Sequence, residues 1–426
     1  MKAIFRWTIL GVPVAVVTGL LVALFLWLLD KVTALHWANP WLLYLLPVTG
    51  ILVWFLYKKA GKNISAGNTL LLSEIRQPST GVPARMAPMV LLGTLLTHLA
   101  GGSAGREGTA VQMGGSFAGW FGKRFKLNPA DGKALLVCGI AAGFAAVFGT
   151  PFAATVFALE ILPARPGRRT AIPGPALVSF PYLLPCVTSA LLADFCCSFT
   201  GIHHTVYHVA VRETGTPSGF IHLDWLLLGK AAIMGIVSGL VALLFIRLGH
   251  VVKATSRFFK RIPWLFPFAG GCVIIILVFV IGRTDYLGLG VIHPDPDMVS
   301  VVSSFSPGGA DTLSWFWKLL FTVVTIGTGF KGGEVTPLFF IGAALGNSMA
   351  GMTGAPVDLM AALGFIAVFA GATNTPFACI IMGIELFGGQ EVLYYGLACL
   401  LAWYFSGSKG IYDPANGNRQ LAGTLD

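Results

Sequence analysis

The chain has 426 residues, of which 55% are hydrophobic and only 11% are charged, and its mean hydropathy is +0.78. So little polar surface cannot cover a water-soluble globule, which excludes a soluble enzyme or binding domain and indicates an integral membrane protein. The 28 Lys and Arg against 18 Asp and Glu leave a formal charge of +10. Because these bases lie in short segments between apolar runs, we interpret the charge as topological and expect no nucleic-acid partner.

The apolar runs predict an all-α polytopic membrane protein. The first run begins at Phe5 and is expected to be a span, because it is too long for a signal core and lacks a small-residue cleavage pattern. Four other runs are interrupted by Gly and Pro and are too short to span, so they predict broken or re-entrant helices. The long runs cover residues 5–29, 41–57, 86–100, 134–148, 174–198, 224–250, 264–282, 314–329, 357–371 and 391–405, and the short ones 107–120, 151–162, 336–350 and 376–387.

Two of the short segments belong to a repeat within the chain. Residues 138–161 match residues 363–386 at a fixed offset of 225, with nine identities in 24 positions. The identities include a shared Thr-Pro-Phe-Ala run, and Glu160 falls on Glu385. A duplicated membrane bundle with interrupted helices in matching places is typical of transporters.

The repeat extends upstream to the other two short segments. An offset of 227 lays residues 105–109 over residues 332–336 and pairs Glu107 with Glu334. We therefore expect two halves that are built alike, without a soluble regulatory domain. The predicted organisation is one transmembrane domain, residues 1–426, made of repeats at about residues 1–210 and 220–426.

Such repeats place a substrate site near the midplane, between the two halves. An interrupted helix leaves backbone N–H groups unpaired and presents the positive end of its dipole, so converging helix starts bind an anion without a fixed cation. The alternative is that the glycines at these breaks only let helices pack closely.

Four of the seven glutamates of the chain lie in the duplicated segments, where a carboxyl is costly unless it is paired or functional. Glu107 and Glu334 each stand beside a glycine-rich break, where a carboxylate can occupy an anion site and leave it when protonated. The alternative for both is capping of a helix start. Glu160 and Glu385 end apolar helices, so we predict structural roles for them, at the water boundary or in binding neighbouring backbone N–H groups. The alternative is that one of them belongs to a proton path.

No metal site or cofactor is expected. His203, His204 and His208 can share a helical face, but they lie in a polar stretch that is more typical of a loop. Asp295 and Asp297 stand in a proline-stiffened segment and are likewise interpreted as loop residues. The seven cysteines lie mostly in apolar runs without Cys-x-x-Cys spacing, which indicates small core residues.

Three motifs in order resemble those of the CLC family of anion channels and anion/proton antiporters. The run from Gly105 to Gly115 begins Gly-Arg-Glu-Gly, the residues from Gly333 to Pro337 resemble the family's Gly-x-Phe-x-Pro helix start, and the run from Gly410 to Asp413 resembles its C-terminal tyrosine motif. The resemblance covers nearly the whole chain. It implies a CLC-like inverted repeat with broken and re-entrant helices, a homodimer with one pathway in each subunit, and two cytoplasmic termini.

The resemblance also implies roles for individual residues. Glu107 would be the gating glutamate that competes with the anion and carries protons, and Tyr412 would lend its hydroxyl to the central anion site. Arg106 would attract anions, or it would be a topological base at the membrane boundary. The helix starts that would supply the donors contain Gly105, Arg106, Gly108 and Thr109 in one repeat and Gly333, Val335 and Thr336 in the other.

Four departures, at five positions, distinguish the chain from the pattern of the chloride-transporting members. Asn68 replaces a serine, Thr109 replaces a proline, Glu334 and Val335 replace an apolar residue and Phe, and Ile161 replaces the inner proton-transfer glutamate. These departures resemble the fluoride-selective branch of the family.

Fluoride is small, strongly hydrated and a strong hydrogen-bond acceptor, so a site that favours it needs many donors at short range. Asn68, Thr336 and Tyr412 can all donate. Glu334 would repel anions when ionised but donate when protonated, and it can replace the proton route that Ile161 interrupts.

The sequence therefore predicts a fluoride/proton antiporter that exports cytoplasmic fluoride in exchange for protons, with fluoride, protons, the lipid bilayer and a second copy of the chain as its partners. One alternative is a chloride/proton antiporter or passive chloride channel of the same fold. Another is a polytopic membrane enzyme that acts on lipid-borne substrates and uses the three histidines, although no catalysis is expected. A minimal chain without a targeting peptide is most consistent with a multi-pass protein of the bacterial inner membrane.

Overall fold

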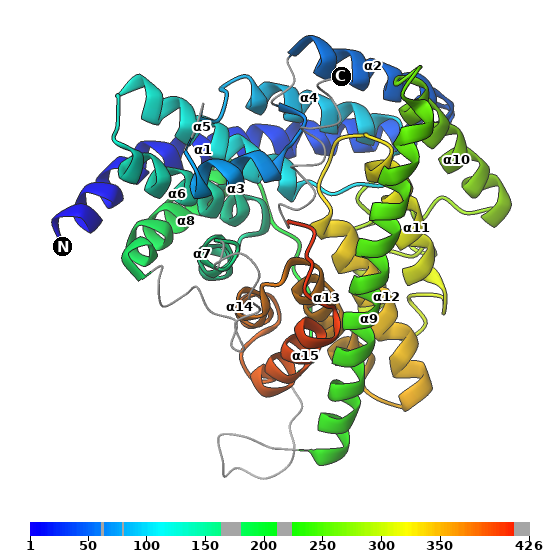
Figure 1. Cartoon of the computed structure of the whole chain (residues 1–426). Coiled ribbons are helices and arrows are strands. Elements are labelled where there is room, and N and C mark those ends of the chain that lie inside the picture. Colours follow the sequence, from blue (N-terminus) through cyan, green and yellow to red (C-terminus); the bar gives the residue numbers. More distant parts are fainter. Residues whose placement is uncertain (61–63, 79–80, 163–179, 211–223, 413–426) are drawn as a thin grey trace.

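The computed structural model describes residues 1–60, 64–78, 81–162, 180–210 and 224–412. Within these ranges the protein is all-α, as predicted, and contains no strand (Figure 1). The described α-helices are α1 (Lys2–Ala38), α2 (Leu46–Ala60), α3 (Asn68–Arg76), α4 (Met86–Leu99), α5 (Glu107–Arg124), α6 (Pro129–Phe148), α7 (Pro151–Glu160), α8 (Phe180–Phe199), α9 (Trp225–Thr255), α10 (Leu265–Ile281), α11 (Ser314–Gly327), α12 (Val335–Thr353), α13 (Val357–Thr373), α14 (Pro376–Phe387) and α15 (Val392–Phe405).

The predicted runs all fall on helices, but some helices are longer than expected. α1 continues nine residues beyond the predicted end at residue 29. α6 begins at Pro129 instead of residue 134, because the Asn128 side chain accepts a hydrogen bond from the Asp131 N–H and proline is well suited to the first helical position. α3 was not predicted at all, because nine residues are too few to show a clear period. Residues 174–179 of the predicted α8 run lie outside the described residues.

Six helices of the described residues are long and apolar enough to cross a membrane, so the chain is a multi-pass membrane protein. One of them is α12, with 19 residues, which corrects the expectation that the run at 336–350 is too short. α7 and α14, with 10 and 12 residues, are too short to span, as predicted.

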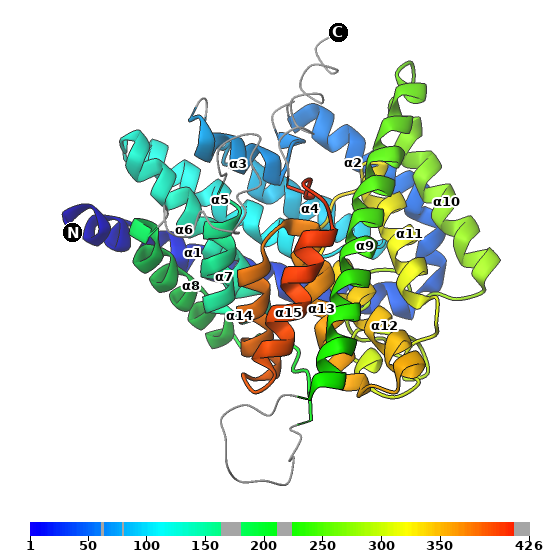
Figure 2. The same ribbon diagram turned by 60° about the horizontal axis from the view of Figure 1, so that its bottom comes forward.

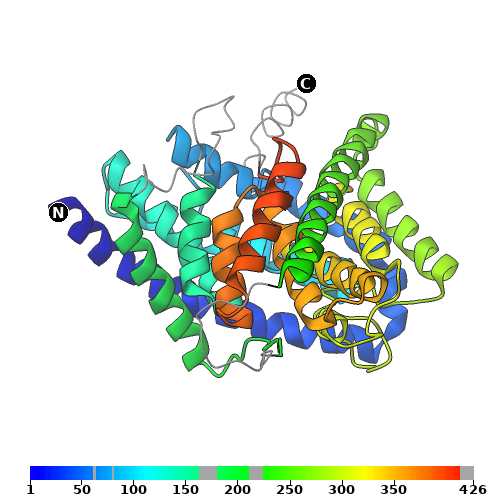
Figure 3. The ribbon, with the colours of Figure 1, turned by 90° about the horizontal axis from the view of Figure 1, so that it is seen from below.

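The helices of the two halves pack alike. α1, α4, α5, α6, α7 and α8 correspond in order to α9, α11, α12, α13, α14 and α15: α5 packs on α6 as α12 packs on α13, and α1 packs on α8 as α9 packs on α15. The matching helices α7 and α14 also pack on each other, as α2 and α10 do. Figures 2 and 3 show α7 and α14 adjacent in the middle of the molecule, between α5, α6 and α8 on one side and α9 and α13 on the other.

Glycines set the close crossings inside each half. A Cβ on Gly139 of α6 would lie 2.6 Å from the Gly114 carbonyl oxygen of α5, and a Cβ on Gly364 of α13 would collide with the Gly342 carbonyl of α12. Small residues let membrane helices approach backbone to backbone. The matching glycine pairs therefore hold α5 against α6 and α12 against α13 in the same way.

The contact between α7 and α14 is reciprocal. The Glu385 carboxylate of α14 accepts hydrogen bonds from the Phe152 and Ala153 N–H groups at the start of α7, at 3.0 and 2.7 Å. The Glu160 carboxylate of α7 accepts from Phe377 and Ala378 at the start of α14, at 3.2 and 2.7 Å. Each carboxylate satisfies the unpaired donors of the other helix, so both glutamates have the structural role that their positions predicted.

The structure corrects the upstream alignment by one residue. Gly105 pairs with Gly333 in an isolated antiparallel bridge, and the N-cap residues of α5 and α12 are Arg106 and Glu334. The equivalent positions are thus offset by 228 rather than 227. Glu107 consequently matches Val335 and not Glu334. The offset changes from 228 in this segment to 225 in residues 138–161, and this change falls in a loop, so a sequence comparison without a gap cannot locate it.

Candidate functional site

The starts of α5 and α12 face each other between the two halves. The Gly105 N–H donates to the Gly333 carbonyl and the Gly333 N–H donates to the Gly105 carbonyl, both at 2.7 Å. The segment before α5 is held from both halves: His98 of α4 bonds the Ala104 carbonyl at 3.0 Å, and the Ser103 hydroxyl bonds that of Thr322 on α11, also at 3.0 Å. These contacts fix the two helix starts relative to each other.

The Glu107 carboxylate occupies the start of α12. Its Oε1 accepts the Val335 N–H at 2.6 Å, and its Oε2 accepts the Thr336 hydroxyl at 2.7 Å and the Arg106 N–H at 2.9 Å. The side chain is 1% exposed. Unpaired N–H groups and the helix dipole favour a negative charge at this position, and the Glu107 carboxylate supplies it. Glu107 therefore caps the helix of the other repeat.

Two glycines make room for this carboxylate. A Cβ on Gly333 would collide with Glu107 Oε1 and lie 2.9 Å from the Gly108 backbone nitrogen. A Cβ on Gly105 would lie 2.6 Å from the same Oε1. The glycines of both predicted motifs thus permit close backbone approach at the site, beyond any role in helix packing.

Glu334 is the N-cap residue of α12, but its side chain makes no cap hydrogen bond. Its Oε1 lies 3.8 Å from the Lys253 ammonium in the last turn of α9, and the side chains are 21% and 42% exposed. Capping of its own helix, the alternative reading of this residue, is therefore wrong. Glu334 also lies within electrostatic range of Glu107.

Asn68 begins α3 and points toward the same helix starts. Its Nδ2 lies 3.5 Å from the position that a Cβ on Gly108 would take. Its Oδ1 is buried and forms no hydrogen bond with any described residue. Oδ1 is an acceptor and does not bind an anion, so the Nδ2 donor beside Gly108 is the Asn68 atom that suits an anion.

Thr109 is buried in the first turn of α5, but its hydroxyl lies 2.6 Å from that of Thr94 on α4. The structure therefore assigns the Thr109 side chain to the α4–α5 contact and not to the anion position. Thr336, from the start of the other helix, is the threonine that reaches the carboxylate.

Tyr412 follows α15 and is the last described residue. The Ile411 N–H donates to the Ala372 carbonyl at 2.8 Å, which ties this segment to α13, and the Tyr412 ring meets Phe157 of α7 edge-on at 6.0 Å. Tyr412 lies within electrostatic range of Glu334 and Glu107. Asp413 of the motif lies outside the described residues.

A pocket lies beside the Glu107 site. Arg106 and Thr336 line it together with His204, Thr205 and Tyr207 from the segment after α8. The Arg106 Nε is buried and has no hydrogen-bond partner among the described residues. The remaining lining residues are apolar: Phe148, Val291, Val301, Phe339, Phe365 and Leu386.

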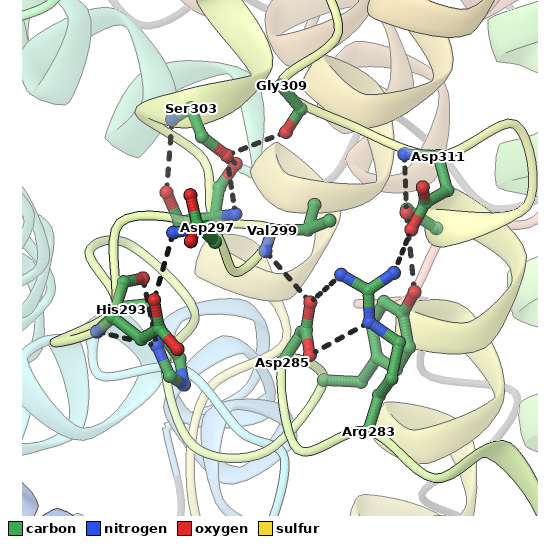
Figure 4. A network of polar contacts seen from close by, with 12 residues as sticks. Arg283, Asp285, His293, Asp297, Val299, Ser303, Gly309 and Asp311 are labelled. Carbon is green, nitrogen blue, oxygen red and sulfur yellow. Dashed lines mark hydrogen bonds and ion pairs between the residues drawn. The ribbon is translucent and has the colours of Figure 1, made fainter.

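One wall of this pocket comes from the loop between α10 and α11, which a polar network holds (Figure 4). Arg283 pairs with Asp285 at 2.8 Å and with Asp311, and Asp285 accepts the Val299 N–H at 2.8 Å. The buried Lys318 of α11 donates to the Tyr286 and Gly288 carbonyls at 3.1 and 2.8 Å. Asp295 and Asp297 lie in this loop, where the Asp297 N–H donates to Asp295 Oδ1 at 3.0 Å.

Within the described ranges, no three His, Cys, Asp or Glu side chains come together in a way that would hold a metal ion. His203 and His208 are exposed, whereas His204 lines the pocket. The described cysteines are free, and five of the seven are buried.

Sequence reasoning missed Lys253 and assigned His204 only to a doubtful metal cluster. Lys253 was interpreted as part of a topological basic stretch, although a base in the last turn of a long apolar helix is also placed to pair with a carboxyl inside the membrane. No sequence signal separates His204 from its two exposed neighbours.

Comparisons with known proteins agree with this geometry. The profile of the family described as "Voltage gated chloride channel" matches residues 49–407. The chain is 42% identical over 415 residues to the "Chloride/fluoride channel protein" of Pseudomonas syringae pv. tomato, covering 96% of this chain and 86% of that protein. It is 26% identical over 358 residues to the "H(+)/Cl(-) exchange transporter ClcA" of Citrobacter koseri, covering 77% of this chain and 68% of that protein.

Solved structures share the fold. The crystal structure of a CLC-type fluoride/proton antiporter has a TM-score of 0.85 and 32% sequence identity, covering 96% of this chain and 97% of that chain. A slow cyanobacterial Cl-/H+ antiporter has a TM-score of 0.74 and 22% identity, covering 99% of both chains. The second similarity concerns the fold alone.

Proposed function

This chain belongs to the voltage gated chloride channel family, the CLC family, and on that premise we propose that it is a fluoride/proton antiporter that exports cytoplasmic fluoride. The observation that carries the proposal is the Glu107 carboxylate in the place of an anion at the start of α12. A carboxylate and a halide ion need the same donors, so only one of them can occupy this position at a time.

Protonation of Glu107 is the step that links the two ions. A neutral carboxyl loses its charge-assisted hydrogen bonds from the Val335 N–H and the Thr336 hydroxyl, which are roughly twice as strong as neutral ones. The carboxyl then leaves with its proton, and fluoride takes its place. When Glu107 releases the proton on the other side of the site, the carboxylate returns and displaces the fluoride, so protons and fluoride move in opposite directions.

Glu334 is proposed as the second proton-transfer group. Ile161, the C-cap residue of α7, stands where the resemblance predicts a proton-transfer glutamate. Glu334 lies within electrostatic range of Glu107 and is partly exposed beside Lys253, so it can exchange protons with water on that side and pass them toward Glu107. Tyr412, within range of both carboxyls, is proposed to donate its hydroxyl to the anion on this path.

Fluoride rather than chloride is supported by the donors at the site. The Val335 N–H, the Thr336 hydroxyl and the Asn68 amide beside Gly108 offer several short contacts to a small, strongly accepting ion. The name of the 42% identical relative mentions both chloride and fluoride, and the structure at 32% identity is that of a fluoride/proton antiporter. Chloride/proton exchange, the activity named for the Citrobacter koseri relative, is the second candidate.

We further propose that the protein lies in a cell inner membrane with its N- and C-termini on the cytoplasmic side, and that it forms a homodimer. Lys2 and Arg6 precede the apolar part of α1, and four bases between residues 253 and 261 surround the end of α9. An excess of Lys and Arg marks the cytoplasmic side of membrane spans, which supports this orientation. It places Lys253 and Glu334 on the cytoplasmic approach to the site.

Liposomes that contain the purified protein test the proposal. They are loaded in parallel with fluoride or chloride, and ion-selective and pH electrodes record anion efflux and proton uptake together. Fluoride efflux well above chloride efflux, with matching proton uptake, is expected. Equal chloride efflux would discard the fluoride assignment but keep anion/proton exchange, and efflux without proton movement would replace antiport by a passive channel. Glu334→Ala is expected to reduce coupled proton uptake in the same assay.

A further inference from the structure

The pocket beside Glu107 contains a histidine that the exchange step does not use. Thr336 belongs both to the pocket and to the gate, because it lines the pocket and donates its hydroxyl to Glu107 Oε2 at 2.7 Å. His204 lines the same pocket. The pocket therefore joins a titratable ring directly to the surroundings of the gating carboxylate.

His204 lies beside an aspartate. Its Nε2 lies 3.5 Å from Asp194 Oδ1 of α8, and the two side chains are 18% and 25% exposed. Both of these atoms are buried, and neither forms a hydrogen bond within the described part of the chain. A Cβ on Gly149 would lie 2.5 Å from the ring carbon Cδ2, so the end of α6 packs closely on the ring. A buried polar pair of this kind needs an explanation, because most buried polar atoms are fully hydrogen-bonded.

A loop at the end of the molecule opposite to Lys253 lines part of the pocket. α9 runs from Trp225 to Thr255 and carries Lys253 in its last turn, and α10 returns in the other direction. The pocket residues Val291 and Val301 follow α10, so they lie toward the end where α9 begins. In the proposed orientation that end faces the outside, which is the side from which protons enter during fluoride export.

We infer that His204, beside Asp194, is a proton-transfer site that carries protons between the outside and Glu107. Imidazole takes a proton from hydronium in the external solution, which leaves water, and becomes imidazolium beside the Asp194 carboxylate. It returns this proton to water in the pocket, and that water protonates the Glu107 carboxylate, which leaves imidazole and a neutral carboxyl. This inference rests on the proposed proton-coupled exchange and deepens it.

Histidine suits this task because imidazole is a common proton shuttle, and Asp194 places a carboxylate near one ring nitrogen. The charged groups around the His204 ring include both positive and negative ones. Arg106 lines the same pocket and opposes a second positive charge, whereas Asp194 favours it. The charge of Glu385 of α14 acts on Asp194, and that of Asp30 of α1 acts on Arg106. Tyr207 adds a hydroxyl beside Arg106.

The test compares His204→Ala with His203→Ala, which changes the exposed neighbour one residue earlier. Proton uptake coupled to fluoride efflux is recorded from liposomes at external pH values from about 5 to 8. His204→Ala is expected to lower proton uptake about tenfold at neutral external pH, whereas His203→Ala follows the wild type. External imidazole is expected to restore the rate of His204→Ala, because a small diffusible base can replace the missing ring in the pocket.

Asp194→Asn leaves the His204 ring intact, so it still tests the inference if the alanine variant fails to fold. It is expected to slow proton uptake about threefold, with a smaller response to imidazole than His204→Ala. A His204→Ala profile equal to that of His203→Ala overturns the inference, and so does a loss of rate that imidazole does not restore in protein that still binds fluoride. A wild type without coupled proton uptake overturns the proposed antiport and this inference together, so the two failures are distinguishable.

Discussion

The two repeats meet at two pairs of matching helix starts, and the contacts at these two pairs differ. At α7 and α14 the contact is reciprocal: Glu385 caps one helix and Glu160 caps the other, each through two backbone N–H groups. At α5 and α12 it is one-sided, because the Glu107 carboxylate of one repeat occupies the donors of the other. The matching position in α12 is Val335, which has no carboxyl to return. The same kind of helix start therefore forms a two-fold contact in one place and a one-sided contact in the other, and a single unmatched glutamate makes the difference.

The largest effect is expected from Glu107→Gln, which removes the charge and the proton carrier from the one-sided pair while keeping its shape. Coupled proton uptake should fall about a hundredfold or more, because positioned proton transfer contributes that much, while fluoride still crosses. Paired fluoride and pH electrodes on liposomes measure both fluxes. Glu385→Gln, from the reciprocal pair, is the matched control and should keep its coupling; proton uptake that survives in Glu107→Gln would contradict the gating role.

Gly333→Ala disrupts the contact between α5 and α12 on the side of α12, which supplies the hydrogen-bond donors. The added Cβ would collide with Glu107 Oε1, so the carboxylate must leave its donors at a cost of about 2 kcal/mol. Exchange should fall about tenfold or more. Gly396→Ala in α15 is the control, since its Cβ would meet nothing within 4 Å and alanine is the better helix former. Equal rates for the two variants in the liposome assay would show that the carboxylate does not need this space.

Glu160→Gln and Glu385→Gln test the reciprocal pair. Each variant turns two charge-assisted hydrogen bonds into weaker ones, so each should destabilise the fold by about 1 to 2 kcal/mol. Because the two contacts are equivalent, the thermal unfolding midpoints in detergent should fall by similar amounts, and proton coupling should remain. A large loss in one variant only, or a loss of coupling in Glu160→Gln, would give that glutamate more than a structural role.

Thr336→Val and Thr109→Val separate two threonines that the motifs place at similar helix starts. Thr336→Val removes the hydroxyl that binds Glu107 Oε2, worth about 1 kcal/mol, so exchange should change about fivefold. Thr109→Val removes only the contact with Thr94 and should leave the pH dependence of exchange unchanged. The measurement is fluoride efflux at several internal pH values, and a shift caused by Thr109→Val would place its hydroxyl on the pathway after all.

The smallest effect is expected from Lys253→Gln. Its ammonium lies 3.8 Å from Glu334 and the lysine side chain is 42% exposed, so the pair contributes less than about 1 kcal/mol. Exchange should change by about twofold, and the difference should shrink at high salt, which screens such a pair. A change of tenfold or more would mean that Lys253 acts on the anion itself.

Most of the fold was predictable because helices in a membrane are local features. The apolar runs identified every helix except α3, and the Gly-rich and Pro-rich breaks located α5, α7, α12 and α14. Helix ends were less certain, since Asn128 extends α6 through a cap that hydrophobicity does not reveal. The repeat was visible as identities, but its register near Glu107 was wrong by one residue, because only the bridge between Gly105 and Gly333 defines equivalent positions.

The candidate site was predictable as a set of residues, and its contacts were not. The motifs identified Glu107, Glu334, Asn68 and Thr336, all of which lie at or beside the start of α12. They also included Thr109, whose hydroxyl turns to Thr94. No motif indicated that Lys253 pairs with Glu334 or that His204 faces a pocket. The first contact joins residues about 80 apart in the chain, and the pocket joins His204 to other segments about 60 to 180 residues away.

The sequence by itself determined that this protein spans a membrane, is duplicated, and carries carboxyls and glycines at its helix breaks, because hydrophobicity and backbone freedom are properties of the residues themselves. Only the tertiary structure decided which carboxyl occupies which helix start. The donors belong to one repeat and Glu107 to the other, and Glu160 and Glu385 likewise cap helices of the opposite repeat. Such contacts depend on how two separate halves dock, since a helix dipole attracts whichever anion the packing brings to its first turn.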